Sequence, residues 1–207
     1  MNSTLILASA SPRRRELLAQ AGYRFEVQPS SIPEPRRPGE DAIRFATRLA
    51  REKAEEVFAR HQPSTAPIMV LGADTVVVCD EEVMGKPADA ADAARMLLLL
   101  SGRTHQVVTG VAVVWGVSAA EVAAEITHVT MRTLSPQEVA GYVAGGEPMD
   151  KAGAYAIQGY AGRWIPRIHG CYFNVVGLPL ALVNSLLEGA ELRLANQLDP
   201  AKDLSLR

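Results

Sequence analysis

The chain has 207 residues, of which 48% are hydrophobic and 21% charged, and its formal net charge is −2. This composition excludes wholesale disorder, a membrane-spanning protein, and a protein that coats nucleic acid through a general basic surface. The chain has two cysteines, too few for a disulfide framework, and its start lacks the basic segment and long apolar run of a signal peptide. We therefore expect a cytoplasmic protein with no membrane partner and not a disulfide-rich secreted one.

Strands are predicted where short apolar or alternating runs occur, and helices where apolar residues recur every three to four positions behind a capping residue. In chain order we predict a strand at 4–8, a helix from Ser11-Pro12 to Gly22, a strand at 23–28, a loop at 29–39, a helix at 42–61, a break at 62–67, a strand at 68–79, a helix at 89–100, strands at 106–115 and 122–132, a helix from the capping box at 135–138 to Gly145, a strand at 164–168, a helix at 183–187 and a loose C-terminal tail. Because the two long strands are adjacent in sequence, the pattern predicts an α/β fold with a mixed sheet.

Three consecutive arginines, Arg13 to Arg15, stand at the start of the first predicted helix. Residues 1–60 carry a net charge of +3, against −5 for the rest of the chain. Positive charges in a first turn oppose the helix macrodipole by roughly 0.3–1 kcal/mol each, and an anion bound at the helix start beside Ser11 would relieve that cost. We interpret the cluster as a phosphate site, with a solvated basic face as the alternative.

Asp74 is a carboxylate inside the apolar run Gly72-Ala73-Asp74-Thr75. Burying a carboxylate is costly unless it is paired or bound to a metal ion. The functional interpretations are a general base and a metal ligand. The alternative is a strand-end aspartate that caps a loop.

Two further segments carry weaker signals. Lys86, in Gly85-Lys86-Pro87, stands beside a turn, where a lysine is usually only solvated. In residues 150–159, DKAGAYAIQG, small residues would let a flat ligand approach the backbone, and Gln158 has both a donor and an acceptor with which to read a base edge. A tight packing loop explains the same segment equally well.

Several familiar motifs do not occur in the sequence. There is no phosphate-binding Gly-x-x-x-x-Gly-Lys-Ser/Thr loop, no Gly-x-Gly-x-x-Gly and no Gly-x-Ser-x-Gly. The four histidines are scattered and have no cysteine partners at zinc spacing, so we predict structural or surface roles for them.

Four segments in this order resemble the motifs of the Maf family of nucleoside triphosphate pyrophosphatases: LASASPRR at 7–14, GADT at 72–75, GKP at 85–87 and DKAGAYAIQG at 150–159. The resemblance extends from about residue 4 to residue 187. It implies a two-lobed α/β fold with an elongated mixed sheet flanked by helices and a central cleft. It also implies a single domain over residues 1–190, which leaves 191–207 as a C-terminal tail.

The resemblance implies roles for residues at matched positions. Asp74 falls on the proposed proton acceptor, and three residues fall on positions linked to base specificity: Arg13, Thr75 and Gln158. The implied phosphate-binding residues are Ser11, Arg13, Arg14, Lys53 and Lys86. Lys53 lies on the charged side of the 42–61 helix, which is otherwise read as a solvated face.

The same resemblance implies a divalent cation, Mg²⁺ or Mn²⁺, held by Glu34 and Asp74. Such a cation suits an all-oxygen site built from one or two carboxylates and phosphates. Family members often have further acids just before the Glu34 position, whereas this chain has Ser31-Ile32-Pro33, so fewer ligands are expected in this loop.

Residues 150–159 resemble the branch of the family that hydrolyses dTTP and UTP to the monophosphate and pyrophosphate, which is the leading hypothesis. The implied partners are a nucleoside triphosphate and a second copy of the chain in a homodimer, without nucleic acid. Two alternatives stay open: the same hydrolysis on a modified or non-standard nucleotide, and a nucleotide-binding regulator of cell division.

Overall fold

The computed structural model describes residues 3–62 and 67–198. The strands are β1 (Thr4–Leu7), β2 (Glu26–Val27), β3 (Ile68–Cys79), β4 (Glu82–Met84), β5 (Thr104–Gly116), β6 (Ala119–Thr130) and β7 (Arg167–His169). The helices are α1 (Pro12–Gln20), α2 (Ala42–Ala59), α3 (Ala90–Leu100), α4 (Pro136–Ala144), α5 (Tyr172–Val176) and α6 (Leu180–Leu198), with 3-10 turns η1 (Glu147–Asp150), η2 (Ala152–Ala154) and η3 (Tyr160–Trp164). None of the described helices is long and apolar enough to cross a membrane.

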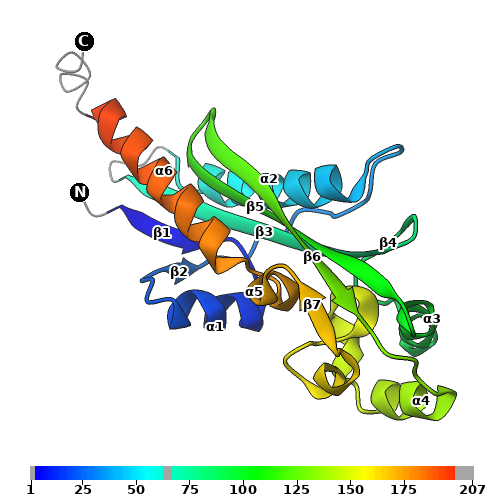
Figure 1. The fold of residues 1–207 in the computed structure, drawn as a ribbon. Helices are drawn as coiled ribbons and strands as arrows, with labels where there is room; N and C mark the ends of the chain where they lie inside the picture. Colours follow the sequence, from blue (N-terminus) through cyan, green and yellow to red (C-terminus); the bar gives the residue numbers. More distant parts are fainter. Residues whose placement is uncertain (1–2, 63–66, 199–207) are drawn as a thin grey trace.

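The strands form one elongated sheet in the order β2-β1-β3-β5-β6-β7, with β4 also paired to β3 (Figure 1). β1 runs parallel to β2 and β3, and the other pairs are antiparallel. The predicted mixed α/β sheet is therefore confirmed. The helices flank it on both faces, as expected.

One edge of β3 is left open beside Asp74. On this edge β1 pairs with β3 as far as Leu71, and β4 pairs with it from Val77 onward. The opposite edge is paired with β5 throughout Val70–Val78. Within the described residues, the stretch of β3 between Leu71 and Val77 therefore has a paired strand on one side only, and the backbone there is open to other groups.

α2 lies directly against one face of the sheet because two strand residues beneath it are glycines. A Cβ atom added to Gly72 would overlap the backbone carbonyl of Ala50, and one added to Gly110 would overlap that of Ala46. The buried side of α2 is built from small residues at helical spacing, Ala46, Ala50 and Ala54, which permits the same close approach. This packing brings the buried side of α2 onto the strand that carries Asp74.

The variant Gly110→Ala is expected to lower the free energy of unfolding by about 1–3 kcal/mol, because its methyl group meets backbone atoms that cannot rotate away. Urea unfolding measures the loss. Gly141→Ala is the matched control: Gly141 lies inside α4 with open space around it, so alanine should stabilise the helix by up to about 1 kcal/mol. Equal unfolding midpoints for Gly110→Ala and the wild type would contradict the close packing.

Two predicted elements differ from the structure. The strand expected at 164–168 is wrong at its start, because Trp164 ends η3 and is fully buried in the core beside α3 and α4; β7 covers only Arg167–His169. The helix predicted at 183–187 is only part of α6, which runs from Leu180 to Leu198 and packs Leu194 against the core. The loose tail expected over about the last dozen residues is therefore wrong as far as Leu198. Residues 199–207 lie outside the described part of the chain.

Smaller differences concern short elements. The predicted strand at 23–28 is reduced to the two residues of β2, and the predicted sequence break at 62–67 includes residues 63–66, which the structure does not describe. β4, α5 and the three 3-10 turns were not predicted. Each has five residues or fewer, too short for a hydrophobic period to be recognised.

Candidate active site

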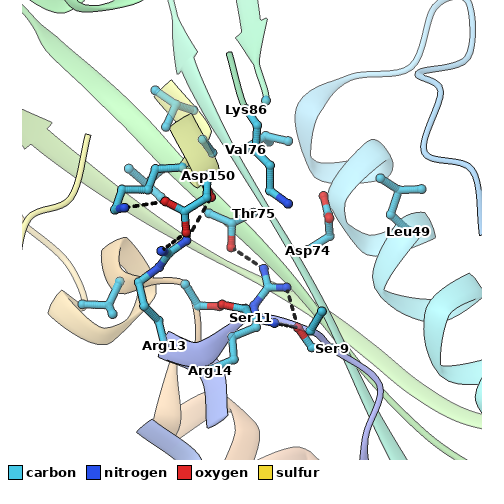
Figure 2. Close-up of a pocket in the computed structure, with 18 of the residues that line it drawn as sticks. Ser9, Ser11, Arg13, Arg14, Leu49, Asp74, Thr75, Val76, Lys86 and Asp150 are labelled. Atoms are coloured by element: carbon cyan, nitrogen blue, oxygen red, sulfur yellow. Dashed lines mark hydrogen bonds and ion pairs between the residues drawn. The ribbon is translucent and has the colours of Figure 1, made fainter. Parts of the chain in front are cut away.

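A cavity of about 530 Å³ opens beside the open edge of β3 (Figure 2). This volume lies within the range of roughly 300–1,000 Å³ that is usual for ligand pockets. All nine residues singled out from the sequence line it: Ser11, Arg13, Arg14, Glu34, Lys53, Asp74, Thr75, Lys86 and Gln158. The fold thus brings together residues from α1, the 29–39 loop, α2, β3, the segment after β4 and the segment after η2.

Asp74 belongs to a charge cluster in which Lys53 lies between two carboxylates. The ammonium Nζ of Lys53 donates to Oδ1 of Asp74 at 2.6 Å, and it also lies 2.7 Å from Oε1 of Glu34. Lys53 and Asp74 are each 8% exposed, whereas the side chain of Glu34 is half exposed. Lys53 therefore does not belong to a solvated helix face, and Asp74 does not cap a loop.

The surroundings of Asp74 act on its pKa in opposite directions. Burial raises the pKa above its ordinary value, while the positive charges of Lys53 and Arg14 lower it, and the net result is a raised pKa. The cluster therefore holds a carboxylate that binds a proton more readily than an exposed aspartate does.

Arg14 occupies the open edge of β3. Its Nη1 donates to the carbonyl oxygen of Ala73 at 2.8 Å and its Nη2 to Oγ1 of Thr75 at 3.0 Å. Its Nε donates to the carbonyl oxygen of Gly177 at 2.8 Å, just before α6. Burial lowers the pKa of Arg14, although Asp74 raises it. Arg14 thus links α1, β3 and the end of α5, and places a positive charge beside the cavity.

Two other polar residues of this wall also have protein partners. Thr75 accepts from Arg14 and its Oγ1 lies 2.9 Å from Oγ1 of Thr109. Ser11 occupies the N-cap position of α1 but makes no capping hydrogen bond with its side chain, contrary to the sequence prediction; its backbone N–H donates to Oγ of Ser9 at 3.2 Å. The helix begins at Pro12 without help from the hydroxyl of Ser11.

The remaining candidates stand on the exposed walls. Lys86 is exposed, and its side chain extends into the cavity on the same side as Asp74 (Figure 2). Gln158 is exposed in the segment after η2. Arg13 forms an ion pair of 2.7 Å with Asp150, while Arg15 is exposed and is not among the lining residues.

Sequence reasoning did not assign three residues that line or support the cavity: Ser9, Thr109 and Asp150. Ser9 lies within the LASASPRR motif and Asp150 begins the DKAGAYAIQG motif, so their positions in these motifs could have identified them. Thr109 gave none, because its contact with Thr75 arises from the pairing of β3 with β5.

Residues 4–190 match the family model described as Maf-like protein. Proteins named dTTP/UTP pyrophosphatase are similar over most of their length: that of Koribacter versatilis is 52% identical over 90% of this chain and 94% of its own, and that of Salmonella typhimurium is 53% identical over 89% and 92%. The protein of this name from Geobacter sulfurreducens is 54% identical over 86% of this chain and 92% of its own length. The chain therefore belongs to the Maf family.

Proposed function

We propose that this chain is a nucleoside triphosphate pyrophosphatase that hydrolyses dTTP and UTP to the monophosphate and pyrophosphate. The observation that carries the proposal is a buried carboxylate, Asp74, at the wall of a cavity that is also lined by five cationic side chains. The family assignment and relatives about 50% identical that bear this name support it.

The chemistry requires positive charge around the phosphates and a base for the attacking water. The negative oxygens of a triphosphate shield its phosphorus atoms from a nucleophile, so cations that neutralise them lower the barrier. Four cavity-lining residues would supply that charge: Arg13, Arg14, Lys53 and Lys86. Asp74 would accept the proton of the water, and its raised pKa brings it closer to the working pH, where a general base is most effective.

Asp74 and Glu34 are the residues that would hold a divalent cation. Both reach the same ammonium group of Lys53, so their oxygens converge on one region. Mg²⁺ is usually held by one or two carboxylates together with substrate phosphates, so this donor set fits a cation that arrives with the triphosphate. In residues 3–62 and 67–198, no group of three acidic, histidine or cysteine side chains gathers to hold a metal ion alone. When bound, the cation would neutralise phosphate charge and polarise a phosphoryl oxygen.

Selection of the base would fall to Arg13, Thr75 and Gln158. The amide of Gln158 offers a donor and an acceptor, which matches the alternating carbonyl and N–H groups on the edge of thymine and uracil. Gln158 stands on the exposed wall of the cavity, where a base can reach it.

A nucleotide panel with pyrophosphate detection tests the proposal, with and without added Mg²⁺ or Mn²⁺. We expect pyrophosphate release to be fastest with dTTP and UTP and to stop when a chelator removes the cation. A strong preference for 7-methyl-GTP or ITP would contradict the pyrimidine assignment. Tight triphosphate binding without product after long incubation would instead favour a nucleotide-binding regulator.

A further inference from the structure

We propose that Asp150 is a positioning residue that fixes the guanidinium of Arg13 in the wall of the cavity and thereby supports nucleotide recognition. This inference rests on the proposed function, since Arg13 affects turnover only if the cavity binds the nucleotide. Asp150 is the first residue of the 150–159 segment and takes no part in the proposed hydrolysis itself.

Asp150 holds Arg13 at two points. Nη1 of Arg13 donates to the carboxylate Oδ2 of Asp150 at 2.7 Å, and Nη2 donates to the backbone carbonyl of the same residue at 3.2 Å. Because the guanidinium is planar and rigid, two hydrogen bonds from different nitrogens fix its orientation as well as its position. The pair links the start of α1 to the end of η1, which lie 137 residues apart in sequence.

Asp150 is itself held by its neighbour Lys151. Nζ of Lys151 donates to Oδ1 of Asp150 at 2.5 Å and to the carbonyl oxygen of Glu147 at 2.6 Å, and its side chain is only 13% exposed. Although burial raises the pKa of Asp150, hydrogen bonds from Lys151 and Arg13 lower it to about 2. The carboxylate is therefore charged at neutral pH and anchored at both of its oxygens.

The ion pair separates two adjacent arginines. Arg13 and Arg14 repel each other, which contributes to the lowered pKa of Arg14. Arg14 turns to the backbone of β3, whereas Arg13 turns to Asp150, across the cavity from Asp74 (Figure 2). Asp150 therefore directs one positive charge to the wall opposite Asp74. Only two of the five N–H donors of Arg13 are needed for this contact, so the others are available to a ligand.

A double-mutant cycle tests the proposal, using kcat/KM for dTTP and UTP in Asp150→Ala, Arg13→Ala and the double variant. We expect Asp150→Ala to lower kcat/KM by about 10- to 100-fold, which is the scale of a misplaced positioning group. In the Arg13→Ala background the same substitution should cause no further loss. Asp150→Glu, which restores the charge, should recover part of the activity, and Asp150→Asn provides a second variant that keeps the side-chain shape.

Asp80→Asn is the matched control. Asp80 forms a comparable ion pair of 2.6 Å with Arg103, but neither residue lines the cavity. Asp80 has a φ of 54°, which asparagine also tolerates, so this variant should keep wild-type kcat/KM.

Two kinds of result, one kinetic and one structural, would overturn the proposal. One is multiplicative loss in the double variant, or wild-type activity in Arg13→Ala, because Asp150 would then not act through Arg13. The other is a crystal structure of Asp150→Ala in which Arg13 keeps its position, which can be determined whatever the substrate is. If the wild-type protein does not release pyrophosphate from dTTP or UTP, the proposed function is contradicted instead. The crystal structure of Asp150→Ala then still tests whether Asp150 positions Arg13.

Discussion

Replacing Asp74 by asparagine is expected to lower kcat for dTTP by about 10²–10⁴-fold, the range that a positioned general base contributes. Asparagine has nearly the shape of aspartate, and its amide oxygen can still accept the hydrogen bond from Lys53. It cannot take a proton from water. Steady-state pyrophosphate release with saturating cation measures the loss.

The same variant should remain folded. Lys53 keeps its second carboxylate partner, Glu34, at 2.7 Å, and a neutral amide costs less to bury than a carboxylate does. Circular dichroism and thermal unfolding check this point. Glu34→Gln is the control, since it removes the half-exposed carboxylate on the other side of Lys53 and should cause a smaller loss of activity. Wild-type turnover in Asp74→Asn would show that Asp74 is neither the base nor an essential metal ligand.

The pH profile gives a further measure of this role. A general base must be deprotonated, so kcat/KM should rise with pH as Asp74 ionises. Because burial raises the pKa of Asp74, this acidic limb should lie above the ordinary aspartate value of about 3.9. The residual activity of Asp74→Asn should lack the limb.

Local patterns predicted those parts of the fold that local interactions determine. The capping box was confirmed: Oγ of Ser135 accepts from the backbone N–H of Glu138 at 3.2 Å, and the carboxylate of Glu138 accepts from the backbone N–H of Ser135 at 2.9 Å. The helix that became α2 was predicted nearly to its ends, because its apolar residues keep a regular period over 18 residues. An apolar run interrupted by one carboxylate likewise predicted β3 with Asp74 inside it.

Long-range contacts decided what local patterns could not. A run of residues rich in arginine, lysine and glutamate gives Lys53 the appearance of a solvated residue, and only the glycines of β3 and β5 beneath α2 let it reach Asp74. Trp164 resembles a strand residue by β-propensity, but it is buried in the core as part of a 3-10 turn. The partner of Arg13 lies far along the chain, and no spacing in the sequence indicates which acid it would meet.

The sequence predicted which residues form the site, but it did not predict the contacts that each of them makes. The resemblance placed nine residues in one cleft, and all nine line the cavity. It did not indicate that Arg14 completes the open edge of β3, because that edge exists only where β1 has ended and β4 has not begun. The motifs thus predict which residues belong to the site. Which charged residue contacts the backbone of β3 and which pairs with another side chain depends on the topology of the sheet.

Lys53→Met is expected to lower the free energy of unfolding by about 3–5 kcal/mol near neutral pH, because it leaves a buried carboxylate without its ion-pair partner. Methionine fills much of the space of the lysine stem, so the loss comes from charge and not from a cavity. Asp74 would then keep the positive charge of Arg14, but the guanidinium of Arg14 already binds two backbone carbonyls and Thr75. Urea unfolding measures the effect, and activity should fall as well.

The loss of stability should depend on pH in a defined direction. The pKa of Asp74 is already raised in the folded protein, and removal of Lys53 raises it further. The folded state then binds a proton that the unfolded state has released, so stability falls as pH rises from the unfolded pKa through the folded one. The deficit of Lys53→Met should therefore grow as the pH rises through the raised pKa of Asp74 and shrink at lower pH, where protonation neutralises the buried group.

Two further variants separate charge burial from general disruption. Lys86→Met removes an exposed lysine of the same cavity and should change stability by no more than about 0.5 kcal/mol. Lys53→Met combined with Asp74→Asn removes both charges of this buried pair, so it should recover much of the stability that Lys53→Met alone loses. If the two single losses of unfolding free energy simply added in the double variant, the two residues would act independently. The loss in Lys53→Met would then not come from leaving Asp74 without its partner. Recovery would instead mean that a neutral pair supplies much of the stability of the charged pair, so the charges are retained for their chemistry.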